Sequence, residues 1–244
     1  MRGRRLRGYP TSSNRASSLH LHWLPREVLS EVSVTLQIAV RLAVSELYFW
    51  ALQASFTGPA GISGGAHLGL QWHPSYPGSG AVNWGGYDKS GSILEGSDSE
   101  LRSTLGNVNT RDYPWVPEQS YRLRIRAADP GWWAGEVTDL MTNVTTPVRS
   151  LRSAGEGLTL AMVWSEIFAP CDAPSVVAVW SDPAGVTLDG RPWRGESYSI
   201  TYQSEADGGC SNTDARVLPN GVGQFTGLAR TTPAGMIIST RLAD

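Results

Sequence analysis

The stretch "ELYFWALQASF", residues 46–56, decides the fold class. Neighbouring side chains of a β-strand point to opposite sides of the sheet, so alternate residues share a face. One face of this stretch carries five apolar or aromatic side chains, Tyr48, Trp50, Leu52, Ala54 and Phe56. The other face carries Leu47, Phe49 and Ala51. A strand that is apolar on both sides is typical of the centre of a layered fold.

The same alternation recurs along the chain, and helical patterning is nearly absent. Further strands are expected within residues 33–40, 66–74, 120–128, 156–168, 175–183 and 196–203. Clusters of Gly, Pro, Ser and Asp such as "TGPAGISGGA", "HPSYPGSG" and "DGRP" separate them. Many short strands with such turns predict an all-β protein, a single jelly-roll, concanavalin-A-like sandwich of two antiparallel sheets. We expect this domain over residues 18–244 and disorder in the basic, Ser-rich residues 1–17.

The composition argues against nucleic acid as a partner and against a span through a membrane. Only 17% of the 244 residues are charged and the net charge is -2, which does not favour binding to nucleic acid. The longest apolar stretch, from Val34 to Phe56, is interrupted by Arg41 and Glu46, so no membrane span is expected. We expect the protein to be monomeric and to use no cofactor.

The two cysteines lie in turn-like settings. Cys171 stands in "IFAPCDAP" and Cys210 in "DGGCSNTD", and their spacing matches no zinc signature. They form either one disulfide or two unrelated thiols, and the disulfide is favoured. Such a bond would stabilise the fold by roughly 3–4 kcal/mol. It would also place the protein outside the cytoplasm, although the basic start "MRGRRLRG" lacks the apolar region of a signal peptide.

Acidic residues give a weak case for glycoside hydrolysis. A retaining mechanism needs two carboxyl groups about 5–5.5 Å apart, and laminarinase-type sandwiches supply them in an E-x-D-x-x-E pattern. The chain has no such pattern. Asp98 and Glu100 stand in "GSDSE", which is more typical of a solvated or calcium-binding loop. Glu166 shares a strand face with Trp164, so it is either buried against an arginine or faces a ligand.

Signals for other chemistry are weaker still. No G-x-S-x-G elbow accompanies the four histidines, so a nucleophilic serine is not expected. Glycine-rich "GVGQFTG" and "GPAGISGG" lack the lysine and the following helix of a phosphate-binding loop. A histidine metal site is unsupported, and Glu166 remains the one weak catalytic candidate.

Aromatic residues flanked by glycine and polar groups give the leading binding candidates. In "NWGGYD", Trp84 and Tyr87 stand among Asn83, Asp88 and two glycines. Glycines allow a ligand to approach closely, and amide or carboxylate groups bond hydroxyl groups. The alternative is an aromatic hairpin that packs on the end of the sandwich.

Trp132 and Trp133 are adjacent in "DPGWWAGEVTD" and must point to opposite faces of a strand. We expect one of them in the core between the sheets. The other covers the outer face or lines a ligand groove. The arginines of "YRLRIR", residues 121–126, are expected on a solvated sheet face, with recognition of an acidic ligand as the alternative.

Several of these segments resemble a bacterial family, the domain of unknown function numbered 3472. The resemblance lies in "YFWALQASF", "AHLGLQW", "YRLRIRAADPGWWAGEVTDLMTN" and "VWSEIF", and spans roughly residues 30 to 200. The two cysteines and "GGCSNTD" resemble the actinobacterial branch of the family. The resemblance implies a concanavalin-A-like sandwich, often in a carbohydrate context and in secreted proteins. The family supplies no established catalytic residues to carry over.

Together these patterns favour a non-catalytic, extracytoplasmic module that binds carbohydrate or another surface. Its expected ligand contacts are Asn83, Trp84, Tyr87, Asp88, Trp132 and Trp133, and a polysaccharide is the expected partner. The alternatives are a polysaccharide-active enzyme that uses Glu166 or the Asp98 loop, and a structural or adhesion domain without a small ligand.

Overall fold

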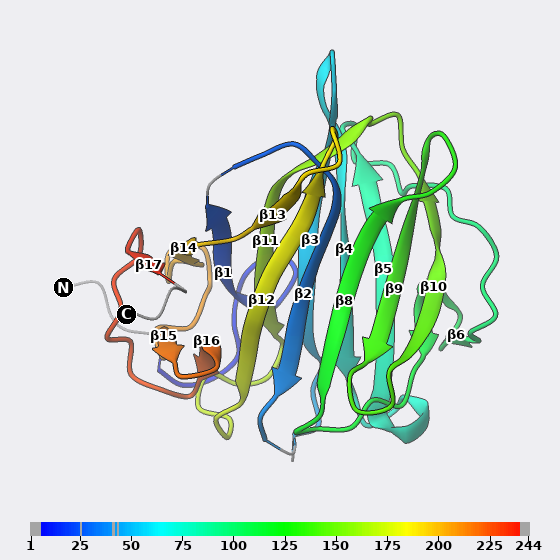
Figure 1. Cartoon of the computed structure of the whole chain (residues 1–244). Coiled ribbons are helices and arrows are strands. Elements are labelled where there is room, and N and C mark those ends of the chain that lie inside the picture. Colours follow the sequence, from blue (N-terminus) through cyan, green and yellow to red (C-terminus); the bar gives the residue numbers. More distant parts are fainter. Residues whose placement is uncertain (1–5, 25, 41, 43, 240–244) are drawn as a thin grey trace.

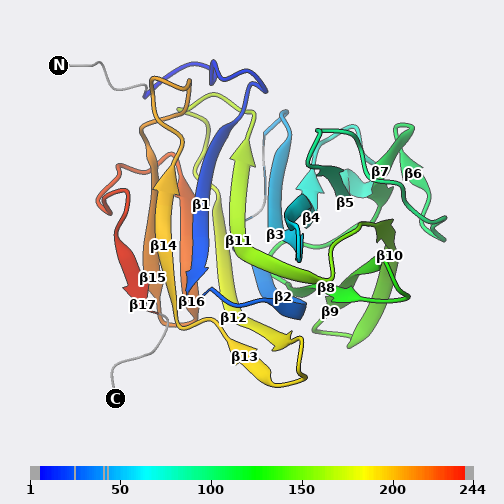
Figure 2. The ribbon, with the colours of Figure 1, turned by 90° about the horizontal axis from the view of Figure 1, so that it is seen from above.

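The computed structural model describes residues 6–24, 26–40, 42 and 44–239, and its strands form two stacked layers (Figures 1 and 2). The first layer contains, in order of pairing, β17 (Ile237–Ser239), β14 (Ser197–Tyr202), β1 (Ser17–Leu24), β11 (Gly157–Ile167), β3 (Tyr48–Gly58), β4 (Gly61–Trp72), β5 (Gly80–Asp88), β7 (Asn107–Asp112) and β6 (Ser103–Thr104). A short 3-10 helix, Pro77–Ser79, connects β4 to β5.

The second layer contains, in order of pairing, β15 (Thr213–Leu218), β16 (Gly221–Thr226), β12 (Val177–Thr187), β2 (Leu29–Ile38), β8 (Ser120–Ala127), β9 (Trp132–Asp139) and β10 (Val144–Arg152). β13 (Pro192–Arg194) folds back on β12. These pairings are antiparallel, and Leu158 of β11 also pairs with Leu29 of β2, which links the layers. The expected all-β sandwich is confirmed.

The core lies between the layers and is one continuous cluster. From β3 it receives Trp50, Leu52 and Phe56, whereas Phe49 and Ala51 face away from it and join Trp164 in a separate small cluster. The two apolar faces of β3 therefore pack in two different places. One packs against the second layer, and the other forms the floor of a surface described below.

The tandem tryptophans divide between core and surface. Trp133 is buried in the core, with its ring centroid 5.5 Å from that of Phe56. Trp132 is half-buried and lies at the start of β9. The expectation that one fills the core is confirmed.

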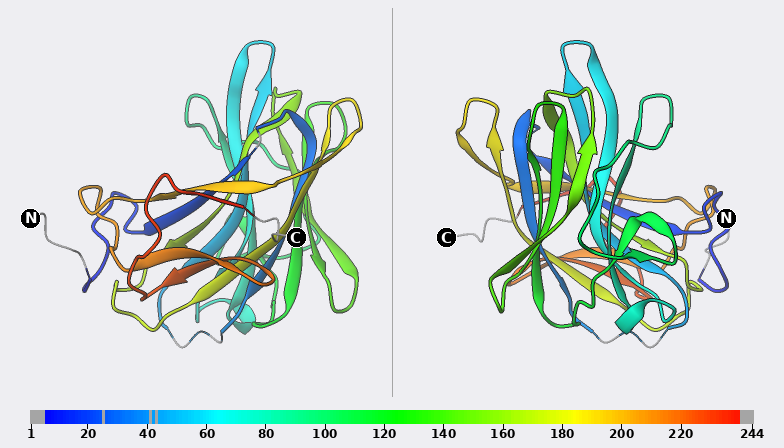
Figure 3. Two further views of the ribbon diagram at one scale, coloured as in Figure 1. Left: turned by 60° about the vertical axis from the view of Figure 1, so that its left-hand side comes forward. Right: turned by 90° about the vertical axis from the view of Figure 1, so that its right-hand side faces the viewer.

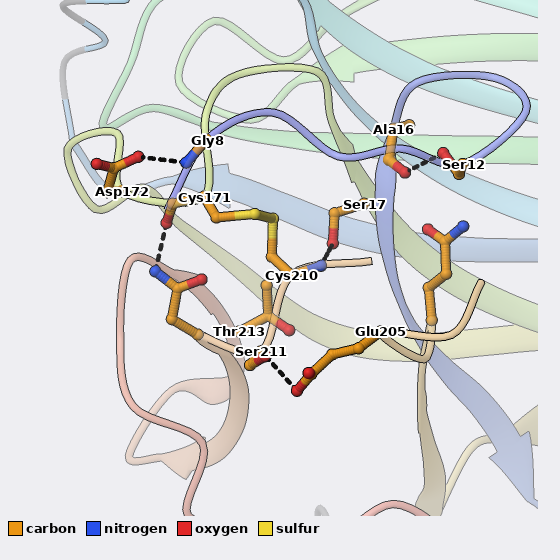
Figure 4. The surroundings of a disulfide bond; sticks show 12 residues. Gly8, Ser12, Ala16, Ser17, Cys171, Asp172, Glu205, Cys210, Ser211 and Thr213 are labelled. Atoms are coloured by element: carbon orange, nitrogen blue, oxygen red, sulfur yellow. Dashed lines mark hydrogen bonds between the residues drawn. A yellow bond between two sulfur atoms is a disulfide. The ribbon is translucent and has the colours of Figure 1, made fainter. Parts of the chain in front are cut away.

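The disulfide forms between Cys171 and Cys210, whose Cα atoms are 5.5 Å apart (Figure 4). It ties the segment after β11 to the segment between β14 and β15. The N-terminal chain packs here too, because Cys210 N donates to Ser17 Oγ at 2.9 Å and Cys171 N donates to Gly8 O at 2.8 Å. In the described part of the chain no helix is long and apolar enough to cross a bilayer.

Residues 1–17 were expected to be disordered, and most of that expectation is wrong. Residues 1–5 lie outside the described part. From Leu6 onward the segment runs along the end of the first layer, held by Thr11 N, which donates to Gly208 O at 2.9 Å. Ala16 is fully buried and Ser17 already belongs to β1. Backbone hydrogen bonds order this segment, and hydrophobic patterning does not reveal such bonds.

Candidate functional site

The outer face of the first layer carries an unusual mixture of aromatic and polar side chains. Strand register brings them together, since Phe49 pairs with Glu166 and Ala51 with Trp164 across β3 and β11. On the other side of β3, Gln53 pairs with His67 of β4. All of these side chains point away from the core because they alternate with core residues.

This face is hollowed into a groove of about 680 Å³. The groove is lined by Asn14, His20, Phe49, Gln53, Ser55, Gly64, Gly65, His67, Tyr87, Asp88, Trp164, Glu166 and Phe168. Gly65 pairs with Ser55 on one side and Tyr87 on the other, and the missing side chain leaves the floor open between them. That end of the groove lies below the β3–β4 hairpin, which rises beyond the rest of the molecule (Figures 1 and 3).

Glu166 lies at the opposite end of the groove. Its Oε1 accepts hydrogen bonds from Asn14 Nδ2 at 3.1 Å and Ser18 Oγ at 3.4 Å. Burial raises the pKa of this carboxyl group above its ordinary value of 4.5, and the two donors oppose the rise because they stabilise the charged form. Among the described residues no arginine pairs with Glu166, so the expected burial against an arginine is wrong. Among the residues that the structure describes, no group forms a hydrogen bond with the second oxygen of Glu166, Oε2.

An aromatic floor separates Glu166 from Gln53. The Trp164 ring packs edge-on against Phe49 at 4.8 Å and against His67 at 5.6 Å, between ring centroids. Its indole Nε1 donates to Gln53 Oε1 at 2.9 Å. This bond orients the carboxamide so that its NH₂ group remains for a ligand.

The two histidines of the groove are neutral at ordinary pH. Burial lowers the pKa of His67 to about 4, although an interaction with Asn83 opposes this. Burial, and next the nearby His22, lower the pKa of His20 to about 4. Both rings are therefore uncharged at neutral pH.

Tyr87 and Asp88 close the groove at the β5 end. Tyr87 is 50% exposed. Asp88 Oδ1 accepts bonds from Ser90 N at 2.8 Å, Ser90 Oγ at 2.6 Å and Ser92 N at 2.9 Å. The Ser90 hydroxyl group is the main cause that lowers the pKa of Asp88, so this carboxylate stays ionised.

The other expected ligand contacts lie elsewhere. Trp84 is fully buried between the layers, so it has no surface to offer a ligand. Asn83 is buried and donates to Thr110 Oγ1 at 2.9 Å. Trp132 and Trp133, on the second layer, do not line the groove. Strand alternation explains why the expected ligand contact at Trp84 is wrong. Along β5, Tyr87 points to the outer face of the layer, whereas Trp84 points to the core.

The groove also contains residues that the sequence did not indicate as ligand contacts, among them Asn14, His20, Gln53, His67 and Trp164. A usable signal existed for two of them. Gln53 is the one polar residue within "FWALQA", residues 49–54, and His67 lies inside an apolar strand. Each is therefore a polar interruption of an apolar pattern. Asn14 carries no such signal because its place depends on a contact 152 residues away in the chain.

Asp98 and Glu100 lie on the loop between β5 and β6, as expected from their glycine and serine neighbours. They line a separate hollow of about 330 Å³ with Arg126 and Arg149. In the second layer, Arg124 and Arg126 of β8 pair with Glu136 of β9, and Arg124 also pairs with Glu31 of β2. Two of the three arginines on this face of β8, Arg124 and Arg126, thus pair with carboxylates.

No protein-family model and no curated protein matches the sequence, so the resemblance to the domain numbered 3472 stays a prediction. Solved structures do resemble the fold. Scytalido-glutamic peptidase with a peptide-based transition-state analogue is 12% identical, with a TM-score of 0.47, over 86% of this chain and 98% of that one. SCP-B, a member of the eqolisin family of peptidases in complex with the tripeptide Ala-Ile-His, gives the same four values.

The similar structures are described as peptidases. The expectation of a non-catalytic carbohydrate-binding or surface-interaction module is corrected on the geometry of its expected contacts. The buried position of Trp84, the leading expected sugar contact, removes its main support. At such low identity the comparison bears on the fold alone, so the function has to be argued from the groove.

Proposed function

We propose that this protein hydrolyses peptide bonds of extended polypeptides, with Glu166 as the general base. One observation carries the proposal. Glu166 is a carboxyl group of raised pKa whose Oε1 is anchored by Asn14 and Ser18 while Oε2 is open toward a large groove. A positioned carboxyl group with a pKa closer to the working pH is the usual form of a general base.

The shape of the groove suits a linear chain. Glu166 lies opposite Phe49, and Tyr87 lies opposite Gly65, which pairs with Ser55. These two ends are six residues apart along β3 and three strands apart across the layer, which corresponds to roughly 24 Å. An extended polypeptide of about seven residues covers that length. Its backbone amides would meet the Gln53 carboxamide, and its apolar side chains would meet the floor formed by Phe49 and Trp164.

The reaction needs one water molecule. The Glu166 carboxylate takes a proton from water as the water oxygen bonds to the scissile carbonyl carbon. The same carboxyl group gives that proton to the leaving nitrogen when the C–N bond breaks, which yields a carboxylic acid and an amine. Asn14 and Ser18 hold the carboxyl group in place during both transfers.

A second candidate is peptide binding without cleavage, and the spacing of the polar groups favours it. Gln53 pairs with Met162, four residues from Glu166 along β11, so the Cα atoms of Gln53 and Glu166 are roughly 14 Å apart. The Gln53 amide therefore holds the substrate at a distance from the general base. A groove used for binding alone would have the same arrangement.

A cleavage assay separates the two candidates. A reduced and alkylated unfolded protein is incubated with the protein between about pH 4 and pH 7, and the products are identified by mass spectrometry. Hydrolysis predicts cleavage that Glu166→Gln lowers by about 100-fold or more. Glu156→Gln is the matched control because Glu156 is exposed and outside the groove. Full activity of Glu166→Gln would overturn the role of Glu166, whereas binding without cleavage would support the second candidate.

We also propose that the protein acts outside the cytoplasm. The Cys171–Cys210 bond supports this because structural disulfides persist in oxidising compartments. Thiol-blocking mass spectrometry of the protein taken from cells and from medium would test it. Two free thiols in the mature protein would contradict the proposal.

A further inference from the structure

We propose that Tyr87 and Asp88 form a subsite for a cationic side chain, arginine or lysine, of the polypeptide in the groove. The proposal rests on the peptide-binding function above and names the class of side chain that this end of the groove selects. It is carried by the geometry of the Asp88 carboxylate and by the exposed ring of Tyr87, which lines the same groove.

Asp88 is oriented by its own turn. Three close hydrogen bonds reach Oδ1, from Ser90 N, Ser90 Oγ and Ser92 N, and the Gly91 backbone N–H adds a smaller stabilisation of the carboxylate. Oδ2 has no bonding partner in the described part of the chain, and no Lys, Arg or His nitrogen there lies within 4.0 Å of the carboxylate. A fixed carboxylate with one open oxygen matches the donors of a guanidinium or ammonium group.

Tyr87 precedes Asp88 at the end of β5, and both residues line the groove. Tyr87 is 50% exposed, and its strand neighbour across β4 is Gly65, which places no side chain over it. A cation over an exposed aromatic face is attracted by the ring quadrupole. The stem of an arginine or lysine can also lie along the ring while its charged end reaches Asp88.

The charges of the groove also favour a cationic side chain. Its lining contains the carboxyl groups Asp88 and Glu166 but neither arginine nor lysine. The pKa values of His20 and His67 are about 4, so both rings are neutral at neutral pH and do not offset the carboxylates there. The one lysine of the chain, Lys89, follows Asp88 but is exposed and does not line the groove. The groove therefore attracts cations as a whole, and Asp88 is the ionised group at its far end.

The length of the groove determines how far the cationic residue of the substrate lies from the cleaved bond. Because the two ends are roughly 24 Å apart, the cationic residue lies about five to seven residues from the bond that is cleaved. Peptides that carry a single arginine at successive positions would show the preference only in that range, on one side of the bond.

The test compares arginine with citrulline, its neutral isostere, at the preferred position. For the full chain we expect kcat/KM and affinity, measured by fluorescence anisotropy, to favour arginine by about threefold to fivefold, the size of exposed cation contacts. Asp88→Asn keeps the Oδ1 acceptor and hence the turn, and should abolish the preference for arginine over citrulline. Tyr87→Leu should weaken the preference, whereas Tyr87→Phe keeps it. Asp98→Asn, an exposed Asp→Asn change outside the groove, should leave it intact.

The outcomes separate the subsite from the hydrolytic function. Cleavage of both peptides without an advantage for arginine would overturn the subsite and leave hydrolysis standing. An arginine advantage in binding that Asp88→Asn removes, without any cleavage, would support the subsite and contradict hydrolysis. A preference that survives Asp88→Asn would overturn the assignment to Asp88.

Discussion

Trp164 donates its indole N–H to Gln53 Oε1 at 2.9 Å, which joins β11 to β3 on the outer face of the first layer. The bond fixes which end of the Gln53 carboxamide faces the groove. Trp164 is only 5% exposed and also packs against Phe49 and His67, so the orientation is supported from three sides.

Loss of this bond should affect substrate binding more than chemistry. Trp164→Phe keeps an aromatic ring but removes the donor, which frees Gln53 to rotate. We expect KM to rise about fivefold with little change in kcat, and the free energy of unfolding to fall by about 1 kcal/mol. Steady-state kinetics and urea unfolding measure the two effects. A fall in kcat at unchanged KM would contradict a role in binding.

The groove histidines should make stability depend on pH. The pKa of His67 and of His20 is about 4 in the folded chain, below the ordinary 6.5. The unfolded chain therefore binds more protons between these values, so stability is full above about pH 6.5 and falls as the pH drops toward 4. Urea unfolding at a series of pH values should show a shallower dependence for His67→Gln. An unchanged dependence would show that His67 does not contribute.

The disulfide should contribute substantially to stability. It closes a loop with a sequence separation of 39, which corresponds to about 4 kcal/mol in the chain-entropy treatment. Replacing both Cys171 and Cys210 by serine should lower the melting temperature accordingly. Calorimetry on the oxidised protein and the double variant measures this, and equal melting temperatures would contradict it.

Trp84 should matter for packing. It is fully buried, and a Cβ atom on Gly135 of the opposite layer would lie 2.7 Å from its ring. Gly135→Ala should therefore destabilise the fold by about 1–3 kcal/mol through overpacking, and Trp84→Ala by about 3–5 kcal/mol through a cavity. Peptide affinity of the folded fraction should stay unchanged. An affinity loss without destabilisation would instead place Trp84 at a ligand.

The sequence predicts the sandwich well because its signals are local. The alternation around Trp50 and the turn-like setting of Cys171 each depend on a few neighbouring residues, and both lead to correct predictions. The central position of β3 also follows from its two apolar faces.

The site is harder to predict because it depends on register between distant strands. Glu166 meets Phe49 and Asn14 only after β1, β3 and β11 pair, and no local pattern contains that information. Alternation predicts that Trp84 and Tyr87 point to opposite faces, but not which of them faces the core. The arginine expected beside Glu166 is replaced by two neutral donors, Ser18 of β1 and Asn14 of the segment that composition alone had marked as disordered.

The pH dependence of kcat/KM for a peptide substrate tests the central claim most directly. Because burial raises the pKa of Glu166 above 4.5, and the general base must be ionised, activity should rise with pH along a limb centred above 4.5. Asn14→Ala removes a donor that stabilises the charged form, so it should move the limb to higher pH. A limb that stays in place in this variant, or that lies below 4.5, would contradict the assignment of Glu166 as the base.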